Sequence, residues 1–393
     1  MTLRFPRVND RIYLDHAASA PLRPRAKEAW NRAQEQVGNP SSRHQDGVLS
    51  RELLENSREV MKTFLGGRGH EVVFTSGGSE AIVLGILGTL GPIFEGAHVV
   101  ATAIEHSAVL GAISTAQKLG AQVTIVSVHR DGTLDLDAFH DALRPDTRLA
   151  CVQHANNETG VVQPVAEARE IVSRTSARLL VDAVQTAGKI PLDNLEADLL
   201  TVSAHKFGGS KGTGALRLAP GIDITPPVCG ATHEGGRRAG TEDVAGAVAM
   251  AAAAKECLEL DLTAEGMKRM ADRRARWDRG IEDMLELVRP TVLSSTIPQT
   301  SSLLMRGLRG DAVADMLDSL GVSVGTGAAC HNRGEARPSH VLTALGLSRR
   351  ESNSAIRASF DCTISSESID RALEALRTAA EALLRAAGSL SRI

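Results

Sequence analysis

The chain has 393 residues, of which 42% are hydrophobic and 23% are charged, and its formal net charge is -3. This composition is that of an ordinary globular protein, and it argues against a fibre, a disordered chain and a broad basic surface for nucleic acid. A chain of this length usually divides its core, so we expect one large domain and one smaller domain.

Short apolar runs recur between residues 70 and 220, with helical segments between them. The runs cover residues 72–74, 98–101, 123–128, 149–153, 179–181, 199–202 and 215–218. Strands that alternate with helices are typical of a mainly parallel sheet covered by helices on both faces. The sequence therefore predicts an α/β fold whose ligands bind at the strand ends.

The pattern changes after Thr241, where longer helical stretches begin. We expect helices over residues 244–259 and 264–287, a strand over 301–304 and a final helix over 366–387. The second, smaller domain is expected in this part of the chain.

No segment has the features of a signal peptide, a membrane span or a metal site. The first residues carry no apolar stretch of signal-peptide length, and the longest apolar run, residues 244–254, is too short to span a bilayer. The five cysteines contain no CxxC pair, which argues against a disulfide framework or a zinc ribbon. They are Cys151, Cys229, Cys257, Cys330 and Cys362. We expect a cytoplasmic protein with no bound metal and no membrane partner.

Lysine is scarce in this chain, with only eight, and Lys206 has an unusual setting. It follows the predicted strand 199–202 within Ser203-Ala-His-Lys-Phe-Gly-Gly. A lysine at a strand end beside small residues can approach a flat cofactor and form a Schiff base. The competing interpretation is a solvated lysine in a turn.

The neighbouring strand end adds groups that a pyridoxal 5′-phosphate (PLP) ring needs. Asp182 directly follows the apolar run 179–181, and a carboxylate at the pyridinium nitrogen keeps that ring an electron sink. Gln185 lies three residues further on. The competing interpretation of Asp182 is a helix N-cap.

The run Phe74-Thr-Ser-Gly-Gly-Ser-Glu predicts a strand, a glycine turn and a helix that begins near Ser79. Free backbone amides and the helix dipole make such a junction an anion site, although an ordinary capped turn has the same pattern. His106 and His154 follow two further strands without the spacing of a metal site, and His106 is expected at the same rim as Lys206.

Eight short motifs occur in an order that resembles the NifS/IscS-like cysteine desulfurases of the class V aminotransferase fold family. They are Asp15-His-Ala-Ala-Ser-Ala-Pro, Gly38-Asn-Pro-Ser-Ser, Thr75-Ser-Gly-Gly-Ser-Glu, Glu105-His-Ser, Asn156-Asn-Glu-Thr-Gly, Val181-Asp-Ala-Val-Gln, Ser203-Ala-His-Lys and Arg238-Ala-Gly-Thr-Glu. Each motif alone is weak, but eight in order over residues 13–360 are specific.

The resemblance implies the fold of the type I PLP-dependent transferases. Its large domain would carry a mainly parallel seven-stranded sheet, beside a smaller α+β domain. We assign residues 1–20 to an N-terminal arm associated with the small domain, residues 21–255 to the large domain and residues 256–393 to the small one.

The resemblance also implies roles for individual residues. Lys206 would hold PLP, Asp182 would pair with the ring nitrogen, and His106 would stack on the ring. Further implied contacts are Gln185 and Asn157 at the ring oxygen or the substrate, Gly78, Ser79, Ser203 and His205 at the phosphate, and Arg357 at the substrate carboxylate. In this family a threonine from a neighbouring subunit completes the phosphate site. It corresponds to Thr241, so a homodimer is implied.

Cys330 lies in the glycine-rich segment Gly325-Thr-Gly-Ala-Ala-Cys-His-Asn-Arg-Gly. By resemblance Cys330 accepts sulfur from L-cysteine as a persulfide, leaves L-alanine, and passes the sulfur to an acceptor or scaffold protein. Without the resemblance it is a free thiol. Cys151, in an apolar strand, is expected to be inert packing.

The residue after Cys330 is His331, where this family usually has a small residue. Gly-Ala-Ala-Cys-His resembles the corresponding segment of selenocysteine lyases, so L-selenocysteine is an alternative substrate. Two further alternatives are an aminotransferase or β-lyase of the same fold, for which Cys330 is dispensable, and a noncatalytic scaffold. The intact lysine, aspartate and arginine set argues against the scaffold.

Overall fold

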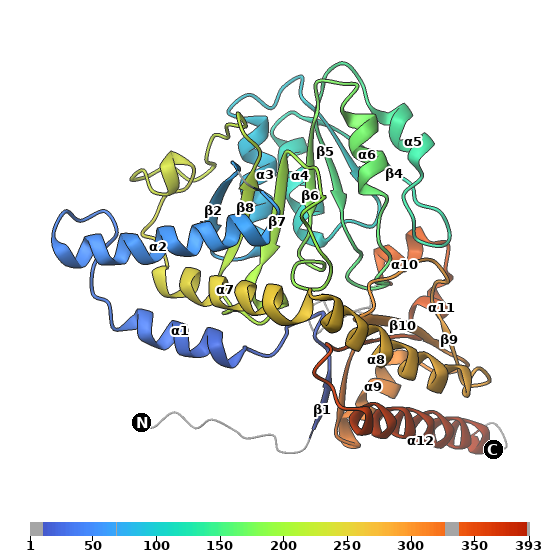
Figure 1. Ribbon diagram of the computed structural model, residues 1–393. Helices are drawn as coiled ribbons and strands as arrows, with labels where there is room; N and C mark the ends of the chain where they lie inside the picture. The colour runs from blue at the N-terminus through green and yellow to red at the C-terminus, as the bar shows by residue number, and fades with distance from the viewer. Residues whose placement is uncertain (1–10, 68, 327–337, 391–393) are drawn as a thin grey trace.

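The computed structural model describes residues 11–67, 69–326 and 338–390, and its larger part is built on a seven-stranded sheet (Figure 1). The strands are β2 (Glu71–Thr75), β3 (His98–Thr102), β4 (Gln122–Val126), β5 (Thr147–Gln153), β6 (Arg178–Asp182), β7 (Leu199–Ser203) and β8 (Gly214–Leu218). All seven predicted strands are present, and none of their ends is misplaced by more than two residues.

The sheet order is β2-β8-β7-β6-β5-β3-β4. Strand β8 runs in the opposite direction to the other six strands. The other strands share one direction, so their carboxyl ends meet at one edge. Strands β3, β7 and β8 are buried along their whole length, which explains their continuous apolar runs.

Helices cover both faces of this sheet. They are α1 (Pro24–Gln34), α2 (Gln45–Phe64), α3 (Gly78–Leu90), α4 (Ser107–Lys118), α5 (Leu136–Ala142), α6 (Val165–Val172) and α7 (Val244–Glu256). Helices α3 and α4 pack on one face, against side chains such as Val99 and Leu180. Side chains one residue further along these strands point to the other face, where α2, α5, α6 and α7 cover them.

A second sheet has the order β1-β11-β12-β10-β9 and joins both ends of the chain. Its strands are β1 (Ile12–Leu14), β9 (Val288–Pro290), β10 (Thr300–Met305), β11 (Val322–Thr326) and β12 (Ala355–Ser359). Its helices are α8 (Ala264–Glu282), α9 (Gly310–Ser319), α10 (His340–Ala344), α11 (Arg349–Ser352) and α12 (Ser366–Leu390). Strand β1 lies beside these C-terminal elements in Figure 1, and Ile12 and Leu14 share a core with Trp277 of α8.

This second unit is a mixed α+β layer, as expected. The domain boundaries at residues 20/21 and 255/256 stay a prediction.

Two of the expected helices end earlier than the sequence pattern suggested. Helix α7 stops at Glu256 and continues as one π-helical turn over Cys257–Asp261. Helix α8 stops at Glu282, because the following residues turn into strand β9, whose Val288 is buried in the core. Within the described part of the chain, no helix is long and apolar enough to cross a membrane.

Candidate active site

The carboxyl ends of β3, β5, β6 and β7 bring chemistry-bearing side chains to one rim of the large sheet. Asp182 is the last residue of β6 and Ser203 the last of β7. His106 follows β3 as the N-cap of α4. Helix α3 begins at Gly78 on the same rim, because β2 runs in the direction of β7. The parallel topology is therefore what assembles this site.

These side chains line a cavity of about 320 Å³. Its lining contains ten of the predicted site residues, namely Gly78, Ser79, His106, Asn157, Asp182, Gln185, Ser203, His205, Lys206 and Arg357. The cavity has the size of a small-molecule site, with an apolar wall from Ile82 and Val184 and several convergent polar groups.

Two further predicted site residues, Thr241 and Cys330, are not in this lining. Thr241 is exposed in the segment before α7 and does not line this cavity. Cys330 lies outside the described residues, as does His331. His154 also lies outside the cavity lining; it is buried, with Nδ1 3.0 Å from Thr186 Oγ1, and burial lowers its pKa to about 4. His154 is therefore a structural residue. Cys151 is fully buried in β5, and burial raises its pKa, as expected for an inert thiol.

Lys206 ends the short 3-10 helix that follows β7. Its Nζ donates hydrogen bonds to the carbonyl oxygens of Ala17 (2.6 Å) and Ala18 (3.0 Å). Both carbonyls belong to the segment after β1, so the N-terminal segment closes the cavity over the lysine. The amine is thus held at the cavity wall, where it can react with a bound carbonyl compound.

Asp182 is buried, and its Oδ1 accepts hydrogen bonds from the Val184 amide (2.9 Å) and the Thr201 hydroxyl (3.4 Å). Burial raises the pKa of this carboxyl, and the hydrogen bonds and nearby His106 and Lys206 oppose the shift. A buried carboxylate of this kind is stabilised by a cationic partner inside the cavity. A protonated pyridine nitrogen is such a partner.

The ring of His106 is fixed by its own helix. The Ala108 amide donates to His106 Nδ1 at 3.1 Å, so the neutral ring carries its hydrogen on Nε2. Burial lowers the pKa of His106, as does the charge of Lys206, while Asp182 raises it. A neutral, oriented imidazole at the cavity wall suits stacking on a flat ring.

The end of the cavity near α3 suits a phosphate. Gly78 and Ser79 are the first residues of α3, where backbone amides lack helical partners and the dipole favours an anion. A Cβ on Gly78 would lie 3.1 Å from both Ser203 Cβ and Val184 Cγ2, so a side chain there would press on these neighbours and narrow the space. Burial and Lys206 lower the pKa of His205, which borders the same space, to about 4.

Arg357 enters from β12 of the second sheet. Its Nη2 pairs with Asp15 Oδ1 at 2.7 Å, and its Nη1 donates to the Asn157 carbonyl oxygen at 2.7 Å. Its buried Nε has no hydrogen-bond partner among the residues that the structure describes. A buried guanidinium with a spare donor at a cavity wall suits a ligand carboxylate.

Sequence reasoning missed two supports of this site. Glu105 is fully buried behind His106, and burial raises its pKa to about 8. Asn156 holds the turn that presents Asn157, since its Oδ1 accepts from the amides of Glu158 (2.9 Å) and Thr159 (2.8 Å). Both residues stood in the recognised motifs, directly beside the residues given roles, but their burial could not be read from spacing.

The comparisons with known proteins agree with this geometry. Residues 12–372 match the family model described as aminotransferase class-V. The chain belongs to the class V aminotransferase family. Its relatives include a protein named cysteine desulfurase IscS from Dictyoglomus turgidum, 36% identical with 95% of each chain covered. Another, cysteine desulfurase IscS 1 from Archaeoglobus fulgidus, is 34% identical, with 93% of this chain and 95% of the relative covered.

Among solved structures, one titled NifS-like protein aligns with a TM-score of 0.85 and 31% identity, covering 95% of this chain and 99% of that chain. A NifS-like protein from Rickettsia africae aligns with a TM-score of 0.82 and 26% identity, covering 94% and 99%. The fold is therefore that of the type I PLP-dependent enzymes of this class V family.

Enzymes of this family depend on PLP. The groups that line the cavity fit this cofactor. The cavity offers an amine, a buried carboxylate, an oriented imidazole and an anion-binding helix start in one space. Among the described residues, no group of three or more histidine, cysteine, aspartate or glutamate side chains could hold a metal ion.

Proposed function

We propose that this class V enzyme is a PLP-dependent cysteine desulfurase, which converts L-cysteine to L-alanine and transfers the sulfur to Cys330. The observation that carries this proposal is the single cavity that brings Lys206, Asp182 and Arg357 together from three different parts of the chain. The names of the relatives support the choice of cysteine as the substrate.

Beside Lys206, two side chains and one helix start would hold the cofactor. Asp182 would face the ring nitrogen, His106 would lie against the ring, and the start of α3 would bind the phosphate. Bound PLP supplies an electron sink that makes the hydrogen on the carbon beside the amino group acidic.

The chain's own groups then act on the substrate. Arg357 binds the carboxylate of L-cysteine, and its ion pair with Asp15 keeps the guanidinium in place. Lys206 Nζ takes the proton from the α-carbon and later returns a proton to the product. The carbonyls of Ala17 and Ala18 hold the amine at the cavity wall between these steps.

The transfer of sulfur to Cys330 needs no external oxidant or reductant. The thiolate of Cys330 attacks the sulfur of L-cysteine, a sulfur–sulfur bond forms, and the bond between that sulfur and the β-carbon breaks. The carbon keeps the electron pair and takes a proton, which gives L-alanine, and the transferred sulfur is oxidised to the persulfide level. A thiol reductant or an acceptor protein then removes it.

We further propose that the enzyme is a cytoplasmic homodimer that delivers sulfur to an acceptor or scaffold protein. The position of Thr241 supports the dimer, because this threonine is exposed and lies outside the cavity of its own chain. A partner subunit could bring its Thr241 to the phosphate end.

The test is alanine formation from L-cysteine under reducing conditions by the wild type, Cys330→Ala and Cys229→Ala. Cys229 is an exposed cysteine and serves as the matched control. We expect Cys330→Ala to keep the bound cofactor and to lose turnover, and Cys229→Ala to keep both. Full turnover by Cys330→Ala would remove Cys330 from the mechanism and favour an aminotransferase or β-lyase.

The same assay with L-selenocysteine addresses the substrate. The Gly-Ala-Ala-Cys-His segment resembles selenocysteine lyases and favours this second candidate. Strong preference for L-selenocysteine would assign that activity instead. No alanine from either amino acid would contradict both functions.

A further inference from the structure

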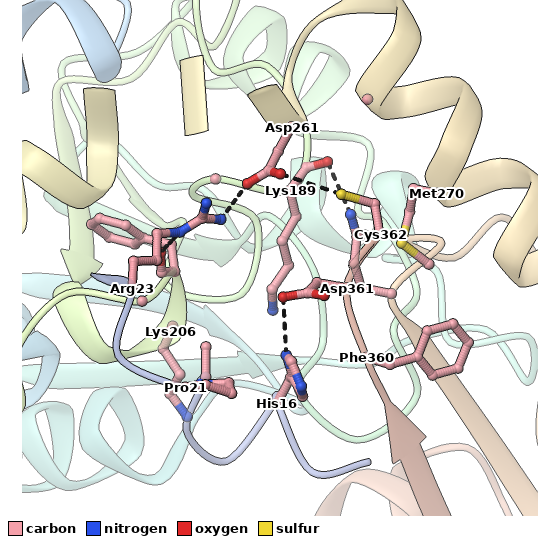
Figure 2. A pocket seen from close by; sticks show the side chains of 16 residues that line it. His16, Pro21, Arg23, Lys189, Lys206, Asp261, Met270, Phe360, Asp361 and Cys362 are labelled. Carbon is pink, nitrogen blue, oxygen red and sulfur yellow. Dashed lines mark hydrogen bonds and ion pairs between the residues drawn. The ribbon is translucent and has the colours of Figure 1, made fainter. Parts of the chain in front are cut away.

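A second lysine, Lys189, lies behind the wall of the cofactor cavity. It follows Gln185 by four residues and lines a separate small cavity of about 50 Å³ that also touches Lys206 (Figure 2). A space of this size with polar walls has room for a few water molecules. Lys189 was among the eight lysines of the sequence, but no motif gave it a role.

Hydrogen bonds connect Lys189 to the cofactor site. Its Nζ donates to Gln185 Oε1 at 3.1 Å, and Gln185 Nε2 donates to the Ala17 carbonyl oxygen at 3.1 Å. The same carbonyl oxygen accepts the hydrogen bond of Lys206 Nζ. The path from Lys189 to Lys206 therefore consists of one amide side chain and one carbonyl group.

This arrangement selects one orientation of the Gln185 amide. As an ammonium group Lys189 only donates, so the amide turns its oxygen toward Lys189 and its nitrogen toward the Ala17 carbonyl oxygen. With Lys189 removed, the amide oxygen of buried Gln185 would lose this donor and the amide could rotate. A rotated amide would place an oxygen against the Ala17 carbonyl oxygen, where two acceptors repel.

The acidic groups around Lys189 have other partners. Figure 2 shows the pairs Asp261 with Arg23 and Asp361 with His16 beside Lys189. Asp15, further along the same wall, pairs with Arg357. Within the described ranges, no ion pair joins Lys189 to a carboxylate. Burial lowers the pKa of Lys189 to about 7, and the charges of Lys206 and Arg357 add to this effect.

The backbone holds Lys189 firmly in this place. Gly188 has a φ of +73°, and a Cβ there would lie 2.7 Å from Phe207 Cβ, so the turn packs directly on the residue after Lys206. The Lys189 carbonyl oxygen accepts a hydrogen bond from Gln299 Nε2 at 3.2 Å, just before β10. Lys189 thus sits where the large sheet, the N-terminal segment and the second unit meet.

We propose that Lys189 is a positioning residue of the cofactor site, whose amino group fixes the Gln185 amide and, through the Ala17 carbonyl, the place of Lys206. Gln185 lines the cofactor cavity, so its orientation decides whether a donor or an acceptor faces Ala17. The role of Lys189 in turnover rests on the proposed desulfurase function, but its role in cofactor binding does not.

The test compares Lys189→Met with the wild-type holoenzyme. Methionine keeps much of the side-chain volume but cannot donate to Gln185. We expect the apoprotein of Lys189→Met to bind PLP about 3- to 10-fold more weakly, the size of one lost hydrogen bond to a buried group. We also expect the visible absorbance of the bound cofactor to titrate with a different midpoint. Both are measured without substrate, so they remain informative if no alanine is formed.

Turnover gives a second measurement. We expect kcat for alanine formation to fall by about 3- to 10-fold, while KM for L-cysteine stays within about twofold, because Arg357 is left in place. Lys255→Met is the matched control; this exposed lysine lies on α7, away from both cavities, and should change nothing. Lys189→Arg keeps a donor and should recover part of the cofactor affinity.

A double-mutant cycle separates this role from a general structural one. If Lys189 acts through the Gln185 amide, Lys189→Met should add little to the loss caused by Gln185→Ala. Additive losses, or an unchanged absorbance midpoint and PLP affinity in folded Lys189→Met, would overturn the proposal. Should Lys189→Met not fold, Lys189→Leu, which also lacks a donor, takes its place in the same comparison with Gln185→Ala.

Discussion

Lys206 and Lys189 line one shared small cavity at the rim of the large sheet, yet their surroundings differ. Lys206 also borders the cavity of about 320 Å³, between an aspartate, a histidine and a helix start. Lys189 faces only the cavity of about 50 Å³, and its hydrogen bond goes to a neutral amide. Lys206 borders a cavity that has room for a cofactor, so its amine can react with one. Lys189 borders no such space, so its amine can only fix the side chains around it by hydrogen bonding.

The same contrast separates the two ends of the active site. Asp182 and Ser203 end β6 and β7, and His106 follows β3 of the same parallel sheet, so their meeting at one edge follows from strand direction. Arg357 comes from the second sheet and depends on Asp15 for its place. The cofactor end is therefore built locally, and the substrate end depends on how the second unit packs.

The largest effect is expected from Lys206→Ala. Loss of the group that moves the α-proton should lower alanine formation by about a thousandfold or more. Turnover and the visible absorbance of the cofactor are measured on the same sample. Lys189→Met should stay far more active, and equal losses in the two variants would contradict the division of roles between the lysines.

Arg357→Lys tests the substrate end. Lysine keeps the charge but not the planar two-pronged donor, so kcat/KM for L-cysteine should fall by about 10- to 100-fold. Most of the change should appear in KM, measured by alanine formation over a range of cysteine concentrations. Unchanged PLP affinity is expected, since the cofactor end draws on other residues.

Gly188→Ala tests the turn that places Lys189. Alanine is disfavoured at φ +73°, and its Cβ would press against Phe207, so the free energy of unfolding should fall by about 1–3 kcal/mol. Urea unfolding measures it. Gly111→Ala on α4 is the matched control, because a Cβ there meets no atom within 4 Å and alanine favours a helix. Equal destabilisation by both variants would contradict the assigned packing.

The last effect depends on pH and concerns Glu105, whose pKa is raised to about 8 by burial. The folded state then keeps a proton that the unfolded state releases near pH 4.5, so the wild type loses stability as pH rises from 5 to 8. Glu105→Gln cannot titrate, and its stability relative to the wild type should rise over that range by about 3 kcal/mol. Urea unfolding at pH 5 and pH 8 measures the difference, and a difference that does not change with pH would show that Glu105 is ionised.

Sequence alone determined the seven strands of the large sheet and the residues at their ends. Continuous apolar runs mark strands buried on both faces, and the residue after such a run lies at the rim when the strands are parallel. Asp182, His106 and Lys206 were found in this way, and the family motifs added Asn157, Gln185 and Arg357.

Only the tertiary structure decided how the second unit completes the site. The pairing of β1 with β11, the ion pair of Asp15 with Arg357, and the contact of Lys206 with Ala17 join residues more than 180 positions apart. The amine of Lys189 was equally hidden, since its four-residue spacing from Gln185 gives no sign of burial. Local sequence patterns indicate which faces of a strand or helix are buried. They do not indicate which distant groups line the same cavity, and those groups determine the charge and the role of each lysine.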